Sequence, residues 1–140
     1  MIREASVSDY NDICKICTED LGYDCEPDLV KVRLENLDKS REIVFVIDVD
    51  GKAVGYVHAE KYNTLYFESI VNIQGLAVAK RYQKNGYGKA LMEAVESWAR
   101  DNNISLVRLN SGITRTGAHE FYRKLGYDNE KEQIRFMKKV

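Results

Sequence analysis

Residues 67–89 read FESIVNIQGLAVAKRYQKNGYGK, and this stretch decides the fold. Its first half has the apolar, β-branched character of a strand. Val71 and Ile73 place apolar side chains on odd positions, whereas Leu76 and Val78 place them on even positions. Because side chains alternate between the two faces of a strand, this change of parity requires a slip of one residue.

Gly75 lies where the parity changes, so we predict a strand over residues 67–79 with a β-bulge at Gly75. A bulge leaves backbone N–H and C=O groups outside the ladder. Those groups could bind an extended ligand as if it were a neighbouring strand.

The segment after this strand predicts a βαβ unit. A glycine-containing turn covers residues 83–88, and residues 90–98 then carry apolar side chains at helical spacing. A further strand is predicted over residues 104–110, parallel to the first. The turn therefore lies at the N-terminus of a helix, where free N–H groups and the helix dipole favour an anion.

Two common phosphate-binding motifs do not fit this turn. A dinucleotide fingerprint needs glycine or alanine three residues after Gly88, where Leu91 stands. A P-loop needs Ser or Thr at position 90 and glycine at position 83, but these positions hold Ala90 and Gln83. The pattern Q-x-x-G-x-G, with Gly86 in its middle, remains; it fits either close approach to a pyrophosphate or a plain tight turn.

Upstream, the patterns predict two helices and three strands. A first strand covers residues 2–5, and Ser8 can cap a helix that ends near Leu21. A second helix begins near Pro27. Strands over residues 43–49 and 53–61 flank Asp50-Gly51, a strong signal for a two-residue hairpin turn.

Length and composition predict one globular domain over residues 1–140, with 44% hydrophobic and 31% charged residues. A net charge of −1 gives no basic field for nucleic acid, and no apolar run is long enough for a membrane span. The N-terminus lacks the apolar stretch of a signal peptide, so we expect a cytoplasmic protein.

Cys14, Cys17 and Cys25 fit a reduced compartment better than a disulfide framework. Cys14 and Cys17 form a C-x-x-C, but it falls in a helical pattern, and His58 and His119 are far away in sequence. We expect ordinary packing of these thiols and no metal.

Taken together, the sequence resembles the GNAT superfamily of acyl-CoA N-acyltransferases. The resemblance covers nearly the whole chain, and its pieces follow in the family's order: the opening at Ile2, the hairpin, the bulged strand, Q-x-x-G-x-G, and a final pattern A-x-x-F-Y-x-x-x-G-Y from Ala118 to Tyr127. It implies an α/β (α+β) fold. A central mixed, twisted sheet of about six to seven strands would be flanked by about four helices, with the bulged strand splayed from its parallel neighbour.

The resemblance also implies site residues. Tyr122 matches the tyrosine that protonates the departing thiolate in many members, although its helical spacing equally fits a core aromatic. The residues implied in binding acetyl-CoA lie along the bulged strand, in the turn and around the final helix: Leu76, Ala77, Val78, Gln83, Lys84, Asn85, Gly86, Tyr87, Gly88, Lys89, Arg115 and Phe121.

This sequence departs from the family pattern at two points. Arg115 stands where many members have an asparagine that contacts the cofactor. Where many members place a carboxylate base on the bulged strand, Asn72 and Gln74 stand, and neither titrates. Glu68 lies too far along the strand. His58 and Glu60, on the neighbouring strand, could face either the cleft or solvent.

The implied function is transfer of an acetyl group from acetyl-CoA to a primary amine by direct attack, with Tyr122 as general acid. A non-catalytic acyl-CoA sensor or a partner-binding domain on the same scaffold is the alternative. The acidic residues Asp20, Asp24, Glu26 and Asp28 would favour a cationic acceptor. We expect a monomer or homodimer.

Overall fold

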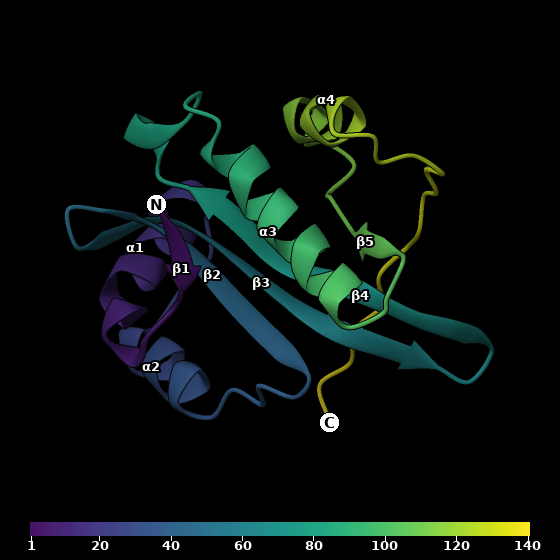
Figure 1. The fold of residues 1–140 in the computed structure, drawn as a ribbon, viewed down its shortest axis with the longest axis horizontal. Helices are drawn as coiled ribbons and strands as arrows, with labels where there is room; N and C mark the ends of the chain where they lie inside the picture. The colour runs from purple at the N-terminus through teal and green to yellow at the C-terminus, as the bar shows by residue number, and fades with distance from the viewer. The chain divides into compact units, whose positions relative to one another are not determined.

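A five-stranded mixed sheet forms the centre of residues 1–109 (Figure 1). The computed structural model describes residues 1–140, which divide into two units, Met1–Leu109 and Asn110–Val140. The strands lie in the sheet in chain order: β1 (Ile2–Glu4), β2 (Glu42–Val49), β3 (Lys52–Thr64), β4 (Phe67–Val78) and β5 (Val107–Leu109). The first four run antiparallel to their neighbours, and β5 is parallel to β4.

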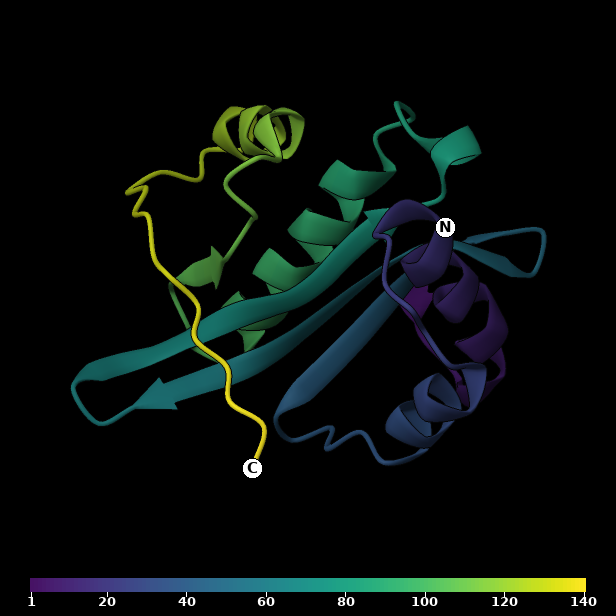
Figure 2. The same cartoon turned by 180° about the vertical axis from the view of Figure 1, so that it is seen from behind.

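Three α-helices belong to this first unit: α1 (Tyr10–Asp20), α2 (Pro27–Glu35) and α3 (Tyr87–Asp101). Two short 3₁₀ turns, η1 (Val7–Asp9) and η2 (Lys80–Tyr82), precede α1 and α3. The helix α3 crosses one face of the sheet, and α1 and α2 lie on the other (Figures 1 and 2). None of the helices combines the length and apolar character that crossing a bilayer requires.

The two faces of the sheet follow from side-chain alternation. On one face, Val46, Tyr56 and Ala77 pack with Ile13 and Ile16 of α1 in a single buried cluster. Residues that alternate with these point to the other face, where α3 buries Leu91, Met92, Val95 and Ala99. The centres of β3 and β4 therefore lie between the two layers of the core and contribute side chains to both.

The second unit contains α4 (Thr116–Lys124). This helix ends in a Schellman motif: Tyr127 N–H donates to Tyr122 C=O (3.0 Å), Gly126 N–H donates to Arg123 C=O (3.0 Å), and Gly126 has a φ of 94°. Arg123 is further held by Glu120 and Glu130.

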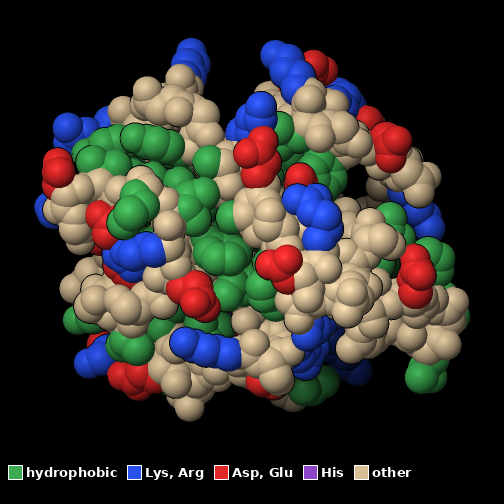
Figure 3. Space-filling view, in the orientation of Figure 1, with side chains coloured by type: hydrophobic (Ala, Val, Ile, Leu, Met, Phe, Trp, Pro, Cys, Tyr) green, Lys and Arg blue, Asp and Glu red, His purple; other side chains and the backbone are tan.

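On the molecular surface drawn in Figure 3, acidic and basic side chains are interspersed.

The predicted mixed sheet, splayed strand and four α-helices are confirmed, as is the hairpin turn, where Asp50 and Gly51 have φ of 51° and 83°. The strand count was wrong: the sheet has five strands instead of six to seven. Residues 128–140 form no strand, and Ile134 and Phe136 stay 81% and 87% exposed, so no apolar burial fixes this segment in a ladder. The last strand, predicted over residues 104–110, covers only Val107–Leu109 in the structure.

The start of α1 also differs from the sequence-based prediction. Ser8 was expected to cap this helix, but it lies in η1, and its hydroxyl bonds to that of Ser6 (2.7 Å). Asp9 takes over the role at this end, because its carboxylate accepts the Ser6 N–H (2.8 Å). Arg3 binds the same carboxylate through two nitrogens, at 2.8 and 2.9 Å, and donates from Nε to Asp48 at 2.8 Å.

This network predicts a pH-dependent contribution to stability. Hydrogen bonding to Arg3 holds the pKa of Asp9 below its ordinary value. The contribution is therefore present above the ordinary pKa of about 4 and is lost as pH falls through the lower, folded-state value. We expect Asp9→Asn to lower the free energy of unfolding by about 1.5–3 kcal/mol at pH 7. Urea denaturation measures this change.

The difference between wild type and Asp9→Asn should shrink at about pH 3 and below. Asp24→Asn, in an exposed loop, is the matched control and should change stability little. A difference that stays constant from pH 7 to pH 2 would contradict the assigned role of the Asp9 charge.

Candidate active site

The predicted bulge is present in β4. His58 pairs with Gly75 and Ala59 pairs with Ile73, so Gln74 is the extra residue opposite the β3 step from 58 to 59. The apolar side chains change parity at this point, as the sequence indicated. The bulge also marks the end of the ladder with β5, whose last pair is Ile73 with Leu109.

Beyond the bulge, β4 has a partner strand on one side only. Ala79 N–H donates to Val54 C=O on β3 (2.8 Å), so the alternate residues Val78 and Leu76 direct their backbone groups to the opposite edge. No β5 residue pairs with β4 at this level. A row of strand-like donors and acceptors therefore follows the bulge, and an extended ligand could pair with it.

The turn after β4 is held by its own side chains. Gln83 donates from Nε2 to Val78 C=O (2.9 Å), and Asn85 donates from Nδ2 to Tyr82 C=O (3.0 Å). Gly86 takes the N-cap position of α3 with a φ of 77°, and a Cβ built on it would meet no atom within 4 Å. Open space at this residue lets a ligand approach the backbone closely.

The first N–H groups of α3 follow at once. Ala90 N–H donates to Gly86 C=O (3.0 Å), which closes the first helical turn. The N–H groups of Tyr87, Gly88 and Lys89 precede that bond and have no partner within the helix. This helix end, with its positive dipole, can receive an anionic group such as a phosphate.

The expected cofactor residues from Leu76 to Lys89 thus lie on one continuous path along β4, the turn and α3. Ala77 differs from its neighbours on this path. Its side chain is 7% exposed within the core beneath α1, and it pairs with Tyr56 on β3. Arg115, Phe121 and Tyr122 belong to the second unit.

In that unit, Arg115 is the N-cap residue of α4 and Tyr122 lies in its last turn. The Tyr122 ring makes edge-on contacts with Phe121 (centroids 5.2 Å apart) and Tyr127 (6.2 Å). Burial raises the pKa of the Tyr122 phenol above its ordinary value, and Arg115 opposes part of that rise. The phenol is therefore a proton donor over the whole neutral range.

No pattern in the sequence indicates the contact of Tyr56 with Cys17 and Gly75 at the bulge. The Tyr56 hydroxyl hydrogen-bonds to Cys17 Sγ (3.1 Å), and a Cβ on Gly75 would lie 2.9 Å from that hydroxyl oxygen. Burial and the Cys17 bond raise the pKa of Tyr56, so the phenol stays neutral. Gly75 is thus required by the hydroxyl beneath it.

The cysteines pack around the same place. Cys14 Sγ donates to the Cys25 carbonyl oxygen (3.2 Å), and burial with hydrogen bonding to Cys14 raises the pKa of the Cys25 thiol to about 12. A thiol with so high a pKa carries little nucleophilic thiolate. No group of three or more His, Cys, Asp or Glu side chains is arranged to hold a metal ion.

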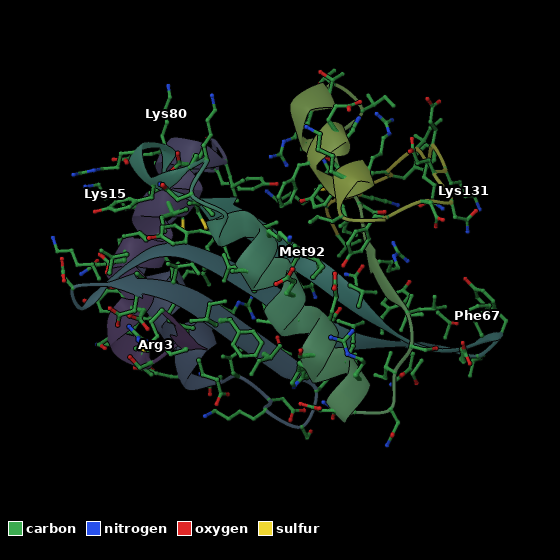
Figure 4. All side chains as sticks on the ribbon, turned by 45° about the horizontal axis from the view of Figure 1, so that its top comes forward. Arg3, Lys15, Phe67, Lys80, Met92 and Lys131 are labelled. Carbon is green, nitrogen blue, oxygen red and sulfur yellow. The ribbon has the colours of Figure 1, made fainter.

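A hollow of about 430 Å³ lies elsewhere in the first unit, between α1, the start of β3 and η2. Its lining mixes basic with acidic side chains, among them Lys15 and Lys80, which both reach toward this end of the unit (Figure 4). None of the predicted cofactor residues lines it.

Phe67 marks the far end of β4, at the tip of the β3–β4 hairpin (Figure 4).

The bulged strand thus parts from its parallel neighbour and leads through the turn into the N-terminus of α3. The sequence model of the acetyltransferase (GNAT) family matches residues 9–127. The chain therefore belongs to this family, and it is an enzyme of the N-acetyltransferase class.

Relatives with similar sequences carry the same class name. An uncharacterized N-acetyltransferase of Archaeoglobus fulgidus is 28% identical over 129 residues, which cover 86% of this chain and 88% of the relative. The uncharacterized N-acetyltransferase MJ1207 of Methanocaldococcus jannaschii is 30% identical over 93 residues. That match covers 65% of this chain and only 41% of the relative's length.

A similar fold appears in the solved structure of AAC(6')-Iy in complex with a bisubstrate analog, CoA-S-monomethyl-acetylneamine. Its TM-score is 0.84 at 18% sequence identity, over 100% of this chain and 98% of that one. At this identity the likeness shows the fold alone.

The contact between Gly75 and Tyr56 leads to a stability prediction. Gly75→Ala should lower the free energy of unfolding by about 1–3 kcal/mol, because the new methyl group overlaps the Tyr56 hydroxyl. The ring carbons of Tyr56 are 3.6 Å from the same point. Tyr56→Phe should therefore relieve much of the overlap.

Urea denaturation of the two single variants and the double variant measures the coupling. We expect a favourable coupling of about 0.5–2 kcal/mol between Gly75→Ala and Tyr56→Phe. Strictly additive effects would show that the hydroxyl does not restrict position 75.

Proposed function

We propose that this enzyme transfers an acetyl group from acetyl-CoA to a primary amine by direct attack of the amine on the thioester. One observation carries the proposal: the β4–β5 ladder ends at Ile73, and β4 continues to Val78 with no partner strand on that edge. The turn after η2 then leads to the N-terminus of α3. The open strand edge could bind the pantetheine arm of coenzyme A, and the helix N-terminus could bind its pyrophosphate. The two protein parts stand in the same order as these two parts of the cofactor.

In this proposal, the backbone groups of Leu76 and Val78 bind the pantetheine arm. The amides of residues 84–89 surround the pyrophosphate, and Gln83 and Asn85 hold the shape of the turn through their bonds to Val78 and Tyr82. The open space at Gly86 fits close approach by a phosphate. Arg115 and Phe121 supply further contacts to the cofactor.

Tyr122 is the proposed general acid. The amine nitrogen attacks the thioester carbonyl, the C–S bond breaks, and the phenol gives its proton to the departing sulfur. The raised pKa of Tyr122 supports this role, because the group must enter the reaction protonated. The cysteines take no part in this proposal. The Cys14 thiol donates to the Cys25 carbonyl, the Cys17 thiol is hydrogen-bonded to Tyr56, and the pKa of Cys25 is raised to about 12.

The acceptor that we propose is a cationic amine. Asp20, Asp24, Glu26 and Asp28 concentrate negative charge in and beside the loop between α1 and α2. An aminoglycoside is one such acceptor, because a solved structure of similar fold is an aminoglycoside acetyltransferase in complex with sisomicin. A polyamine is another.

The test is turnover across a panel of amines. Thiol release from acetyl-CoA is followed with sisomicin, spermidine, a lysine peptide and glucosamine, each with an amine-free control. We expect amine-dependent release and an N-acetylated product by mass spectrometry. Tight coenzyme A binding by calorimetry without release would favour the sensor or partner-binding alternative. Absence of both would overturn the whole assignment.

Tyr122→Phe tests the general acid. The change keeps the ring and its contacts with Phe121 and Tyr127 but removes the hydroxyl, so the fold should survive. We expect turnover to fall by about 10²–10⁴-fold with nearly unchanged coenzyme A affinity. Tyr62→Phe is a matched loss of a hydroxyl outside the proposed site. Wild-type turnover in Tyr122→Phe, measured where chemistry limits the rate, would return this residue to the role of a packed aromatic.

A further inference from the structure

Asn72 holds a buried side-chain oxygen with no hydrogen-bond partner. The atom is Oδ1, and the residue stands in the middle of β4, two positions before the extra residue of the bulge. An unpaired buried acceptor is costly and is rare in folded proteins. The oxygen itself is buried, whereas the side chain as a whole is only partly buried. It is a place for a donor that the protein itself does not supply.

The register of the sheet surrounds this oxygen with charged side chains. Asn72 pairs with Glu60 on β3 and with Arg108 on β5, and His58 pairs with Gly75 one step further along. By alternation these side chains share one face of the sheet with Tyr56, the face that carries α1. Val71 and Ile73 point to the opposite face, toward α3.

Most of the charges on this face have partners. His58 Nε2 lies 2.9 Å from Glu42 Oε1, and the Arg108 guanidinium lies over the ring of Tyr62 at 5.0 Å. Glu60 meets Arg41 through Oε2 at 3.4 Å, a single contact with a side chain that is 57% exposed. A carboxylate can accept about four hydrogen bonds, so Glu60 keeps capacity for a further donor.

Residues that pair directly across antiparallel strands have Cβ atoms about 4.5–5.5 Å apart. A nitrogen with two or more N–H bonds can therefore donate to Asn72 Oδ1 and to the Glu60 carboxylate at once. A carboxylate beside an amide oxygen favours a cationic donor over a neutral hydroxyl. A primary ammonium group meets both conditions.

We propose that Asn72 and Glu60 bind the reacting nitrogen of the acceptor as an ammonium ion, and that Glu60 removes its proton. This inference rests on the function proposed above. Glu60 takes one proton from R–NH₃⁺, and the lone pair that is released forms the N–C bond to the thioester carbonyl. The C–S electrons leave with sulfur, which takes the Tyr122 proton, and the second N–H proton passes to solvent water as the amide forms.

Two variants separate binding from proton removal. Asn72→Leu should raise KM for the amine about 10-fold or more, with KM for acetyl-CoA within about twofold of wild type. The same variant should be as stable as wild type or more so, since it removes an unpaired polar atom. Glu60→Gln should lower kcat about 10²-fold or more, the range typical of a lost general base.

Glu68→Gln is the matched control, because Glu68 is an exposed carboxylate on the same strand as Asn72. The double variant Glu60→Gln/Asn72→Asp should recover part of the lost turnover, since it returns a carboxylate one strand away. The proposal is overturned if Asn72→Leu and Glu60→Gln give amine kinetics like those of Glu68→Gln. It is also overturned if Asn72→Leu loses stability and both KM values rise together.

A second measurement is independent of turnover. The side-chain amide signals of Asn72 in a ¹⁵N spectrum, assigned with the Asn72→Asp variant, are followed during titration with spermidine and with sisomicin. Sodium chloride at equal ionic strength is the control. We expect saturable shifts with the amines only. If wild type turns over no amine, the proposed function fails, and these shifts alone then decide the ammonium site; unmoved Asn72 signals overturn it.

Discussion

The register slip in β4 is the constraint on which the rest of the structure depends. One additional residue, Gln74, changes which side chains face α3 and turns the backbone groups of Leu76 and Val78 toward a free edge. The same slip coincides with the last pair between β4 and β5. A strand without the bulge would place Val71 and Leu76 on opposite faces, whereas the bulge places both on the face that α3 covers.

The Tyr56 hydroxyl lies against the bulge at Gly75, where a larger residue would overlap with it. Tyr56 belongs to the core under α1, yet its oxygen reaches Cys17 and passes within contact distance of Gly75. A polar atom in this position ties the geometry of the bulge to the packing of α1. The helix that closes the core is therefore also the helix that fixes the shape of the candidate site.

Local patterns in the sequence predicted the parts of this fold that depend on local rules. The parity change located the bulge, Asp50-Gly51 located the hairpin, and Gly86 located the N-terminus of α3. Patterns could not reveal contacts between distant residues, such as Tyr56 with Cys17 or Arg3 with Asp48.

Local apolar spacing overstated one strand, and it does not show which residues of a helix are buried. Residues 104–110 read as a full strand, but only Val107–Leu109 pair with β4. In α2, Leu29 and Val32 follow helical spacing yet remain 53% and 50% exposed. Whether a periodic residue is buried depends on what packs against it, which spacing alone does not contain. The unpaired oxygen of Asn72 could not be predicted from the sequence either, because only the folded structure shows that no hydrogen-bond donor lies near it.

The short ladder between β4 and β5 has a consequence for the order in which the sheet opens. Strands β2, β3 and β4 are joined by short hairpin turns, whereas β5 reaches β4 only after the chain has passed through α3. Three residue pairs must offset the entropy of closing that long connection. Amide hydrogens of β5 should therefore exchange with solvent through small, local fluctuations, while those at the centre of β3 exchange only on global unfolding. The edge beside the candidate site should therefore be weakly protected, and a ligand that bridges it would slow exchange there.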